Sequence, residues 1–240
     1  MPPVTRHQAP FLTTRWTCVC AAKADSDDGR RALADLCDAY YEPVVAFLRC
    51  ELREADAARE MSHAFFAQML AGGAIRTVDR EHGRFRSYLL GAVKHFLSHQ
   101  REAALRQKRG GGVEAASLDD TEAQVVADAR QPSPDMAFDR QWALTLLSRA
   151  LSELQRECEV EGKAVVFEKL QPWLTGDAAH GDQLELAASL GMNLNSLKSQ
   201  IHRLKARFRA LVKEQIAATL DDGGSIEEEM TVLFAALRRN

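Results

Sequence analysis

The chain lacks the features that would direct it to a membrane or out of the cell. Among its 240 residues, no apolar run approaches the ~18 residues that a membrane-spanning helix requires. The first ten residues, MPPVTRHQAP, show no basic start followed by an apolar core, so no signal peptide is expected. We therefore expect a cytoplasmic protein that has no membrane partner.

Cysteine is scarce, and its pattern excludes two classes of small stabilised domain. The five cysteines are odd in number and include no Cys-x-x-Cys pair, so neither a disulfide framework nor a zinc knuckle is indicated. The sequence also has no Walker-type glycine loop, nucleophile elbow or Rossmann fingerprint. Neither a catalytic residue nor a cofactor is predicted, and we expect a protein that is not an enzyme.

Two histidine patterns come near to metal motifs without completing them. Glu60 and His63 match one half of a di-iron helix motif, which needs a second Glu-x-x-His and two further carboxylates. His95 and His99 are four residues apart, but they lack the glutamate that follows the first histidine in a zinc protease helix. No metal site is therefore predicted.

What the sequence does contain is helical periodicity along almost its whole length. No stretch alternates apolar and polar residues for long enough to predict a strand, which indicates an all-α protein. Apolar residues recur at helical spacing from Leu33 to Leu48, with a break or kink at Pro43. The same spacing predicts helices from about Asp56 to Leu70 and from about Arg84 to Arg106.

The second half of the chain begins with a polar, acidic segment. Three glycines at 110–112 and the prolines at 132 and 134 bracket it, which is typical of a linker. Asp135 is a candidate N-cap for a long helix that reaches Leu154, and a shorter helix is expected at Ala164–Leu174. We predict two helical domains, residues 1–110 and 139–213, joined by a flexible acidic linker at 111–138. An acidic helical extension is expected at 214–240.

Charge is unevenly distributed around a net value of −3. Residues 76–109 hold nine Arg/Lys against three Asp/Glu, a local +6, and residues 193–213 hold six Arg/Lys and no acid, again +6. Residues 114–140 hold seven acids and two arginines, a local −5. Two basic blocks separated by an acidic one fit a protein that meets a polyanion at two places. Two solvated helix faces would produce the same distribution.

Residues 183–211, QLELAASLGMNLNSLKSQIHRLKARFRAL, carry the most specific pattern. A short helix ends at Leu190, Gly191 supplies a left-handed turn residue, and Asn193 can cap a second helix. This is the helix-turn-helix arrangement, whose second helix enters the DNA major groove. The apolar seam at positions 194, 197, 201, 204, 208 and 211 leaves an outer face that can contact bases and phosphates: Asn195, Ser196, Lys198, Ser199, His202, Arg203, Lys205 and Arg207, with Arg209 beyond.

Four segments together resemble a sigma factor of the extracytoplasmic-function type, in the sigma-70 family. ELAASLGMNLNSLKSQIHRLKARFRALVKEQI is similar to region 4, and DLCDAYYEPVVAFLRCEL to the first helix of region 2. AREMSHAFFAQML is similar to the polymerase-binding helix, and REHGRFRSYLLGAVKHFLSHQREAALRQKRGGG to the segment that melts and reads the −10 element. The resemblance extends from about Thr14 to Leu237, and the FRSYLL segment and region 4 are its specific parts.

The resemblance implies a transcription initiation factor that binds core RNA polymerase, directs it to promoter DNA and helps to melt the −10 element. It would dock on the β′ clamp helices and the β flap, and an anti-sigma factor or a regulatory kinase would be a further partner. Region 4 would read the −35 element. Contacts to polymerase would come from Asp56, Glu60, Met61 and His63. Contacts to the −10 strand would come from Arg84, Arg86, Tyr88, Lys94, His95 and Arg101, with Tyr88 equally compatible with a place in the core.

The sequence departs from the family pattern at two places. Glu60 and His63 stand where the family usually has Asp and Gln, and His95 and His99 stand where Asn or Asp is common. An alternative is a helix-turn-helix regulator or sigma-like adaptor that does not bind polymerase, and co-migration with core polymerase distinguishes it from a sigma factor. A helical scaffold that binds only proteins is a third possibility, and it would show no salt-dependent DNA binding.

Overall fold

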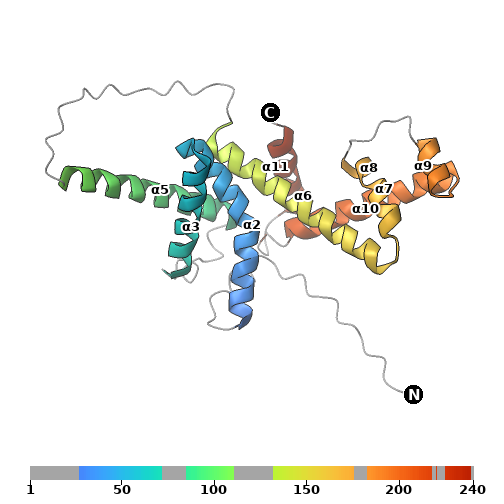
Figure 1. Cartoon of the computed structure of the whole chain (residues 1–240), viewed down its shortest axis with the longest axis horizontal. Helices are drawn as coiled ribbons and strands as arrows, with labels where there is room; N and C mark the ends of the chain where they lie inside the picture. The colour runs from blue at the N-terminus through green and yellow to red at the C-terminus, as the bar shows by residue number, and fades with distance from the viewer. Residues whose placement is uncertain are drawn as a thin grey trace, which may run out of the picture. The chain divides into compact units, whose positions relative to one another are not determined.

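The computed structural model describes residues 27–71, 85–110, 132–175, 183–217, 220 and 225–238. In these residues all regular structure is helical and no strand occurs, which confirms the predicted all-α class (Figure 1). The chain forms two compact units. Unit 1 comprises Met1–Ala143 and Thr219–Asn240, and unit 2 comprises Leu144–Ala218. Most of the predicted linker, residues 111–131, lies outside the described residues.

Unit 1 contains α2 (Asp27–Leu52), α3 (Ala55–Ala71), α5 (Phe85–Gly110), the first part of α6 (Pro134–Val160) and α11 (Ile226–Arg238). Of the two alternatives expected at Pro43, a break or a kink, the break does not occur, because α2 continues through this residue. Proline removes only one backbone donor, and both neighbours of Pro43 in the apolar stripe, Tyr40 and Val44, are fully buried. Burial of this stripe therefore outweighs the lost hydrogen bond.

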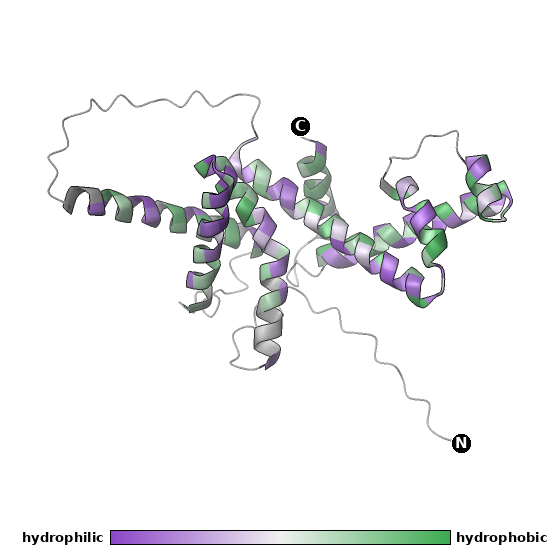
Figure 2. Cartoon of the chain, in the orientation of Figure 1, coloured by the Kyte–Doolittle hydropathy of each residue, from purple (hydrophilic) through white to green (hydrophobic). Residues whose placement is uncertain are grey.

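The core of unit 1 is formed by the apolar sides of α2, α3 and α5. Figure 2 shows apolar and polar residues in alternating bands along α3, as expected for a helix with one buried side. Aromatic rings connect the three helices: Tyr40 meets Phe85 edge to face at 5.2 Å, and Phe65 meets Phe96 at 5.5 Å between ring centroids. The apolar spacing that predicts a helix from about Arg84 to Arg106 corresponds to the buried residues of α5, Phe85, Leu89, Val93, Phe96 and Leu97.

The N-cap of α6 differs from the residue predicted from the sequence. The backbone N–H of Met136 donates to Ser133 Oγ at 3.3 Å, so Ser133 is the N-cap and Asp135 is not. Pro134 is then the first helical residue, a position where its missing N–H costs nothing. Asp135 instead accepts a hydrogen bond from Lys94 Nζ at 2.7 Å, which joins α6 to α5.

A buried charged cluster joins α5, α6 and α11 within unit 1. Arg86 is only 8% exposed, and its Nη1 donates to Asp139 Oδ1 at 2.6 Å. Its guanidinium lies 4.5 Å from the centroid of the Trp142 ring. The carboxylate of Glu229, itself 1% exposed, is 3.9 Å from Arg86 Nη2. The acidic extension predicted at 214–240 therefore contributes a buried carboxylate to unit 1.

Unit 2 contains the remainder of α6, α7 (Ala164–Leu170), α8 (Pro172–Thr175), α9 (Gln183–Ser189) and α10 (Leu194–Ala217). The helix predicted at Ala164–Leu174 is divided in two, because Pro172 cannot donate a backbone hydrogen bond and begins a new helix instead. One hydrophobic cluster lies where α7, α9 and α10 meet. Its buried members are Leu170, Ala187, Leu197 and Ile201.

The cysteines that the structure describes are free thiols. Cys37 and Cys50 are half-buried, and Cys158 is buried in unit 2. Burial raises the pKa of all three thiols above the ordinary value. These thiols therefore stay protonated near neutral pH, which makes them poor nucleophiles and poor metal ligands.

We predict that Arg86→Ala destabilises the chain by about 3–5 kcal/mol, because it leaves the buried Glu229 carboxylate without this nearby cation. Denaturant unfolding followed by helical circular dichroism measures the change. Arg106→Ala is the matched control on the same helix. Its side chain is 75% exposed and, among the described residues, pairs with Glu102 four residues away, so a change within about 0.5 kcal/mol is expected. Equal losses in the two variants would contradict the assignment.

Candidate nucleic-acid interface

The turn between α9 and α10 has the geometry that the glycine predicts. Gly191 has a φ of +63°, in the left-handed region where a side chain is strained. Met192 N–H donates to the carbonyl of Ala187 at 2.9 Å, and Gly191 N–H donates to that of Ala188 at 3.1 Å. This pair of bonds is the Schellman motif, which closes a helix C-terminus while satisfying its last carbonyls. The turn residue predicted from the sequence is confirmed.

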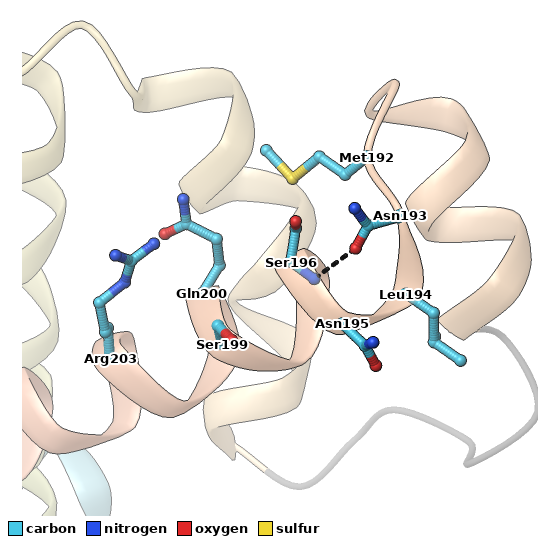
Figure 3. A pocket seen from close by; sticks show the side chains of 8 residues that line it. All are labelled: Met192, Asn193, Leu194, Asn195, Ser196, Ser199, Gln200 and Arg203. Atoms are coloured by element: carbon cyan, nitrogen blue, oxygen red, sulfur yellow. Dashed lines mark hydrogen bonds between the residues drawn. The ribbon is translucent and has the colours of Figure 1, made fainter.

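The first residue after the turn, Asn193, fixes the beginning of α10. Its side-chain Oδ1 accepts a hydrogen bond from the backbone N–H of Ser196 at 2.8 Å, as an N-cap does (Figure 3). The predicted cap is therefore confirmed. No acidic residue occurs in the first turn of α10, so the partial positive charge of the helix N-terminus is not offset there by a carboxylate from its own turn.

The hydrophobic cluster of unit 2 determines which side of α10 faces solvent. Leu197 and Ile201 pack against Ala187 of α9 and Leu170 of α7. Leu211, further along the predicted seam, is also buried, whereas Leu194, Leu204 and Phe208 are only half-buried. With this side packed, six residues predicted to contact DNA are exposed near the beginning of α10: Asn195, Ser196, Lys198, Ser199, His202 and Arg203.

An open hollow of about 680 Å³ lies over the first two turns of α10. Its lining includes Asn195, Ser196, Ser199 and Arg203, four of the predicted residues. Figure 3 shows Met192, Asn193 and Ser196 together at the beginning of the helix and Gln200 and Arg203 further along it. Gln200, which was not among the predicted residues, is half-buried and lines the same hollow. Amide, hydroxyl and guanidinium groups thus line one surface, a set that can donate to and accept from base edges.

Lys205 and Arg207 are placed differently from this group. Lys205 is half-buried. Arg207 donates through Nε and Nη2 to the two carboxylate oxygens of Glu157, at 2.9 and 2.6 Å, and through Nη1 to Glu214 at 2.8 Å. The hydrogen bonds to Glu157, followed by that to Glu214, raise the pKa of Arg207 above its ordinary value. The guanidinium group of Arg207 therefore joins α10 to the later part of α6, and its charge is already balanced by two carboxylates.

The residues predicted to hold the −10 strand are distributed over α5 and do not form one basic surface. Lys94 and Arg101 are exposed but pair with Asp135 and Glu51, at 2.7 and 2.8 Å. Arg86 belongs to the buried cluster described above, and Arg84 lies outside the described residues.

The two remaining −10 candidates keep accessible rings. Tyr88 is half-buried, its ring lies 6.0 Å from that of Phe85, and burial raises the pKa of its hydroxyl. His95 is exposed, and its Nε2 is 3.1 Å from Nε2 of His99. Both Tyr88 and His95 line a groove between α3 and α5, so of the predicted set these two lie on one surface.

The predicted polymerase-binding residues lie on α3 of unit 1. Asp56, Glu60 and His63 are exposed and Met61 is half-buried. His63 Nε2 is 2.9 Å from the hydroxyl of Tyr41, and the two rings stack at 5.5 Å. The buried side of the helix holds Ala58, Ser62, Phe65 and Met69, so the predicted residues lie on or beside its solvent side. Asp56 is paired with Arg59 on the same helix at 3.1 Å.

Comparison with protein-family models, with curated proteins and with solved structures finds no match to this chain. Within the described ranges, each helix is too short or too polar to traverse a lipid bilayer. In the same part of the chain, no three His, Cys, Asp or Glu side chains come together as they would in a metal centre.

We predict that Asn193→Ala lowers the free energy of unfolding by about 1 kcal/mol, because the Ser196 N–H loses its acceptor. Asn193→Asp is the matched control: it keeps an oxygen in the same place and adds a favourable charge at the helix N-terminus, so stability is retained. Thermal unfolding of the three proteins measures the difference. An alanine variant as stable as the parent chain would show that this cap does not hold the turn.

Proposed function

We propose that this chain is a transcription initiation factor that binds core RNA polymerase and directs it to promoters. The observation that carries the proposal is the α9–α10 helix-turn-helix with a polar, acid-free outer surface. From Asn193 to Lys213 the chain has six Arg/Lys and no Asp or Glu. The residue-level resemblance to region 4 of extracytoplasmic-function sigma factors falls on the same helices.

The chemistry of this surface supports reading of DNA in the major groove. Asn195 is an amide of the kind that pairs with adenine, and Arg203 is of the kind that pairs with guanine. Lys198 adds a positive charge for the phosphate backbone. Neither Lys198 nor Arg203 forms an ion pair with another residue that the structure describes, in contrast to Arg207. Their charges are therefore available to a polyanion.

Unit 1 supports the second half of the proposal. The α3 surface with Asp56, Glu60, Met61 and His63 would dock on polymerase, and α5 would lie along the −10 element. The ion pairs of Lys94 and Arg101 are exposed, so exchanging their carboxylate partners for phosphates costs little. Tyr88 offers a ring on which an unstacked base can lie. Opening of the promoter needs no hydrolysis by the chain if the single strand is bound more tightly than the duplex.

We predict that Arg203→Ala weakens promoter binding by about 1–3 kcal/mol, the value of one bidentate base contact. Lys198→Ala should lower the slope of log affinity against log salt by about 1, as expected when one phosphate contact is lost. The control is Lys213→Ala, which removes an exposed charge late in the same helix. The DNA target is identified by sequencing the DNA that is recovered with the protein from cells. The affinity of the polymerase complex for this DNA is then measured over a range of salt concentrations. Equal effects at positions 198, 203 and 213 would remove the N-terminal part of α10 from the reading surface.

We also predict that the purified chain co-migrates with core RNA polymerase on gel filtration. Combined Glu60→Ala and Met61→Ala substitutions should weaken that association, whereas Asp38→Ala, at an exposed position of α2, should not. A chain that binds DNA but never co-migrates with polymerase would be a stand-alone helix-turn-helix regulator. A chain that binds neither would be a protein scaffold.

A further inference from the structure

Two histidines on α5 face each other at a distance that suits metal coordination. His95 and His99 lie one helical turn apart, and both side chains are exposed. Their Nε2 atoms are 3.1 Å apart, and the rings meet edge to face with 4.3 Å between centroids. Without a metal, this contact is a hydrogen bond in which one ring donates and the other accepts. With both rings in the Nδ1–H tautomer, both Nε2 lone pairs become available to one ion.

The separation of the nitrogens fixes the geometry of such an ion. For two metal–nitrogen bonds of about 2.0–2.1 Å, a nitrogen separation of 3.1 Å corresponds to an N–metal–N angle of about 95–100°. This angle lies between the values for octahedral and tetrahedral coordination. The helix therefore holds both ligands close to their metal-bound positions, and little side-chain ordering remains to oppose binding.

The surroundings leave room for the rest of a coordination shell. Both histidines line an open groove between α3 and α5 with a volume of about 1080 Å³. Gln68 and Gln100 line the same groove and bring neutral polar groups to it. Arg106, the arginine among the lining residues, pairs with Glu102 at 3.4 Å, which reduces its repulsion of a cation. Water or an external ligand can thus occupy the remaining positions.

We propose that His95 and His99 form a two-histidine site for a borderline divalent transition-metal ion. Imidazole nitrogens suit Cu²⁺, Ni²⁺ and Zn²⁺, with Cu²⁺ bound most tightly, whereas Mg²⁺ and Ca²⁺ require oxygen ligands. The histidines lack the glutamate base of a zinc protease helix, so the site is proposed for binding alone. With two protein ligands among the described residues, the bound ion keeps open positions and exchanges readily.

The position of the site gives it a consequence that rests on the proposed function. The groove also contains Tyr88, which we assign to the −10 strand. An ion at His95 and His99 would add positive charge to this surface and offer an open position to a phosphate oxygen or a base nitrogen.

Calorimetric titration of the full chain with NiCl₂ and with ZnCl₂, in a buffer that does not coordinate metals, tests the site without DNA or polymerase. The parent chain should show one site at least about tenfold tighter than the background of its other histidines and cysteines. His95→Gln, His99→Gln and the double variant should each lose that site to the same extent, because a chelate needs both rings. His63→Gln and His202→Gln, which alter single exposed histidines, should retain it, and MgCl₂ should give no binding.

Circular dichroism keeps the comparison independent of folding. The variants should be as helical as the parent chain, and Ni²⁺ should raise the thermal midpoint of the parent but not of the double variant. Identical metal isotherms for the parent and double variants would overturn the proposal, as would loss of the tight site in His63→Gln. Because no DNA or polymerase is present, such a failure leaves the proposed function standing. Failure to co-migrate with polymerase equally leaves the metal site in place.

Discussion

The burial of one apolar side of α10 determines how unit 2 meets its surroundings. Leu197 and Ile201 pack on Ala187 and Leu170, and this contact leaves the opposite side of the helix to solvent. The turn at Gly191 and the Asn193 cap set where the helix begins, so they also help to determine which of its sides is packed. Rotation of the helix by one residue, about 100°, would exchange a leucine of the seam for a lysine of the outer surface. The side chains that α10 exposes to solvent are therefore a consequence of packing inside unit 2.

The two basic blocks of the chain are used in different ways. On α5, Lys94 and Arg101 pair with carboxylates from α6 and α2, and Arg86 is buried with Asp139. Near the beginning of α10, Lys198 and Arg203 have no such partners among the described residues. Arg207, further along the helix, is the first arginine of α10 that forms an ion pair with a described residue. Among the described residues, the first block thus contains cations that pair with carboxylates inside unit 1, whereas the second exposes Lys198 and Arg203 without such partners. Charge counted along the sequence does not distinguish these uses, whereas the ion pairs do.

The sequence allowed prediction of features that depend on neighbours a few residues away. The α10 seam, the left-handed Gly191 and the Asn193 cap are all local, and the structure confirms them. One local prediction was wrong because a competing signal lay beside it: Ser133 caps α6 in place of Asp135. At Pro43 the helix does not break, because the apolar stripe of α2 continues through this residue.

The roles of two arginines could not be predicted because their partners are distant in the sequence. Arg207 binds Glu157, which precedes it by 50 residues. Arg86 meets Asp139, 53 residues further on, and also Glu229 near the end of the chain. Both arginines look like phosphate ligands when only helical periodicity is considered. Only the tertiary fold shows that carboxylates already occupy these guanidinium groups.

The contribution of α11 to unit 1 has a consequence for the order in which the protein acquires its structure during synthesis. Glu229 and Leu233 are buried in unit 1, although they follow all of unit 2 in the chain. Because a ribosome releases the chain from its N-terminus, unit 2 is complete before the last helix of unit 1 has emerged. The nascent protein therefore passes through a stage in which all residues of the later unit have been synthesised, while Arg86 in the earlier unit still awaits one of its carboxylates.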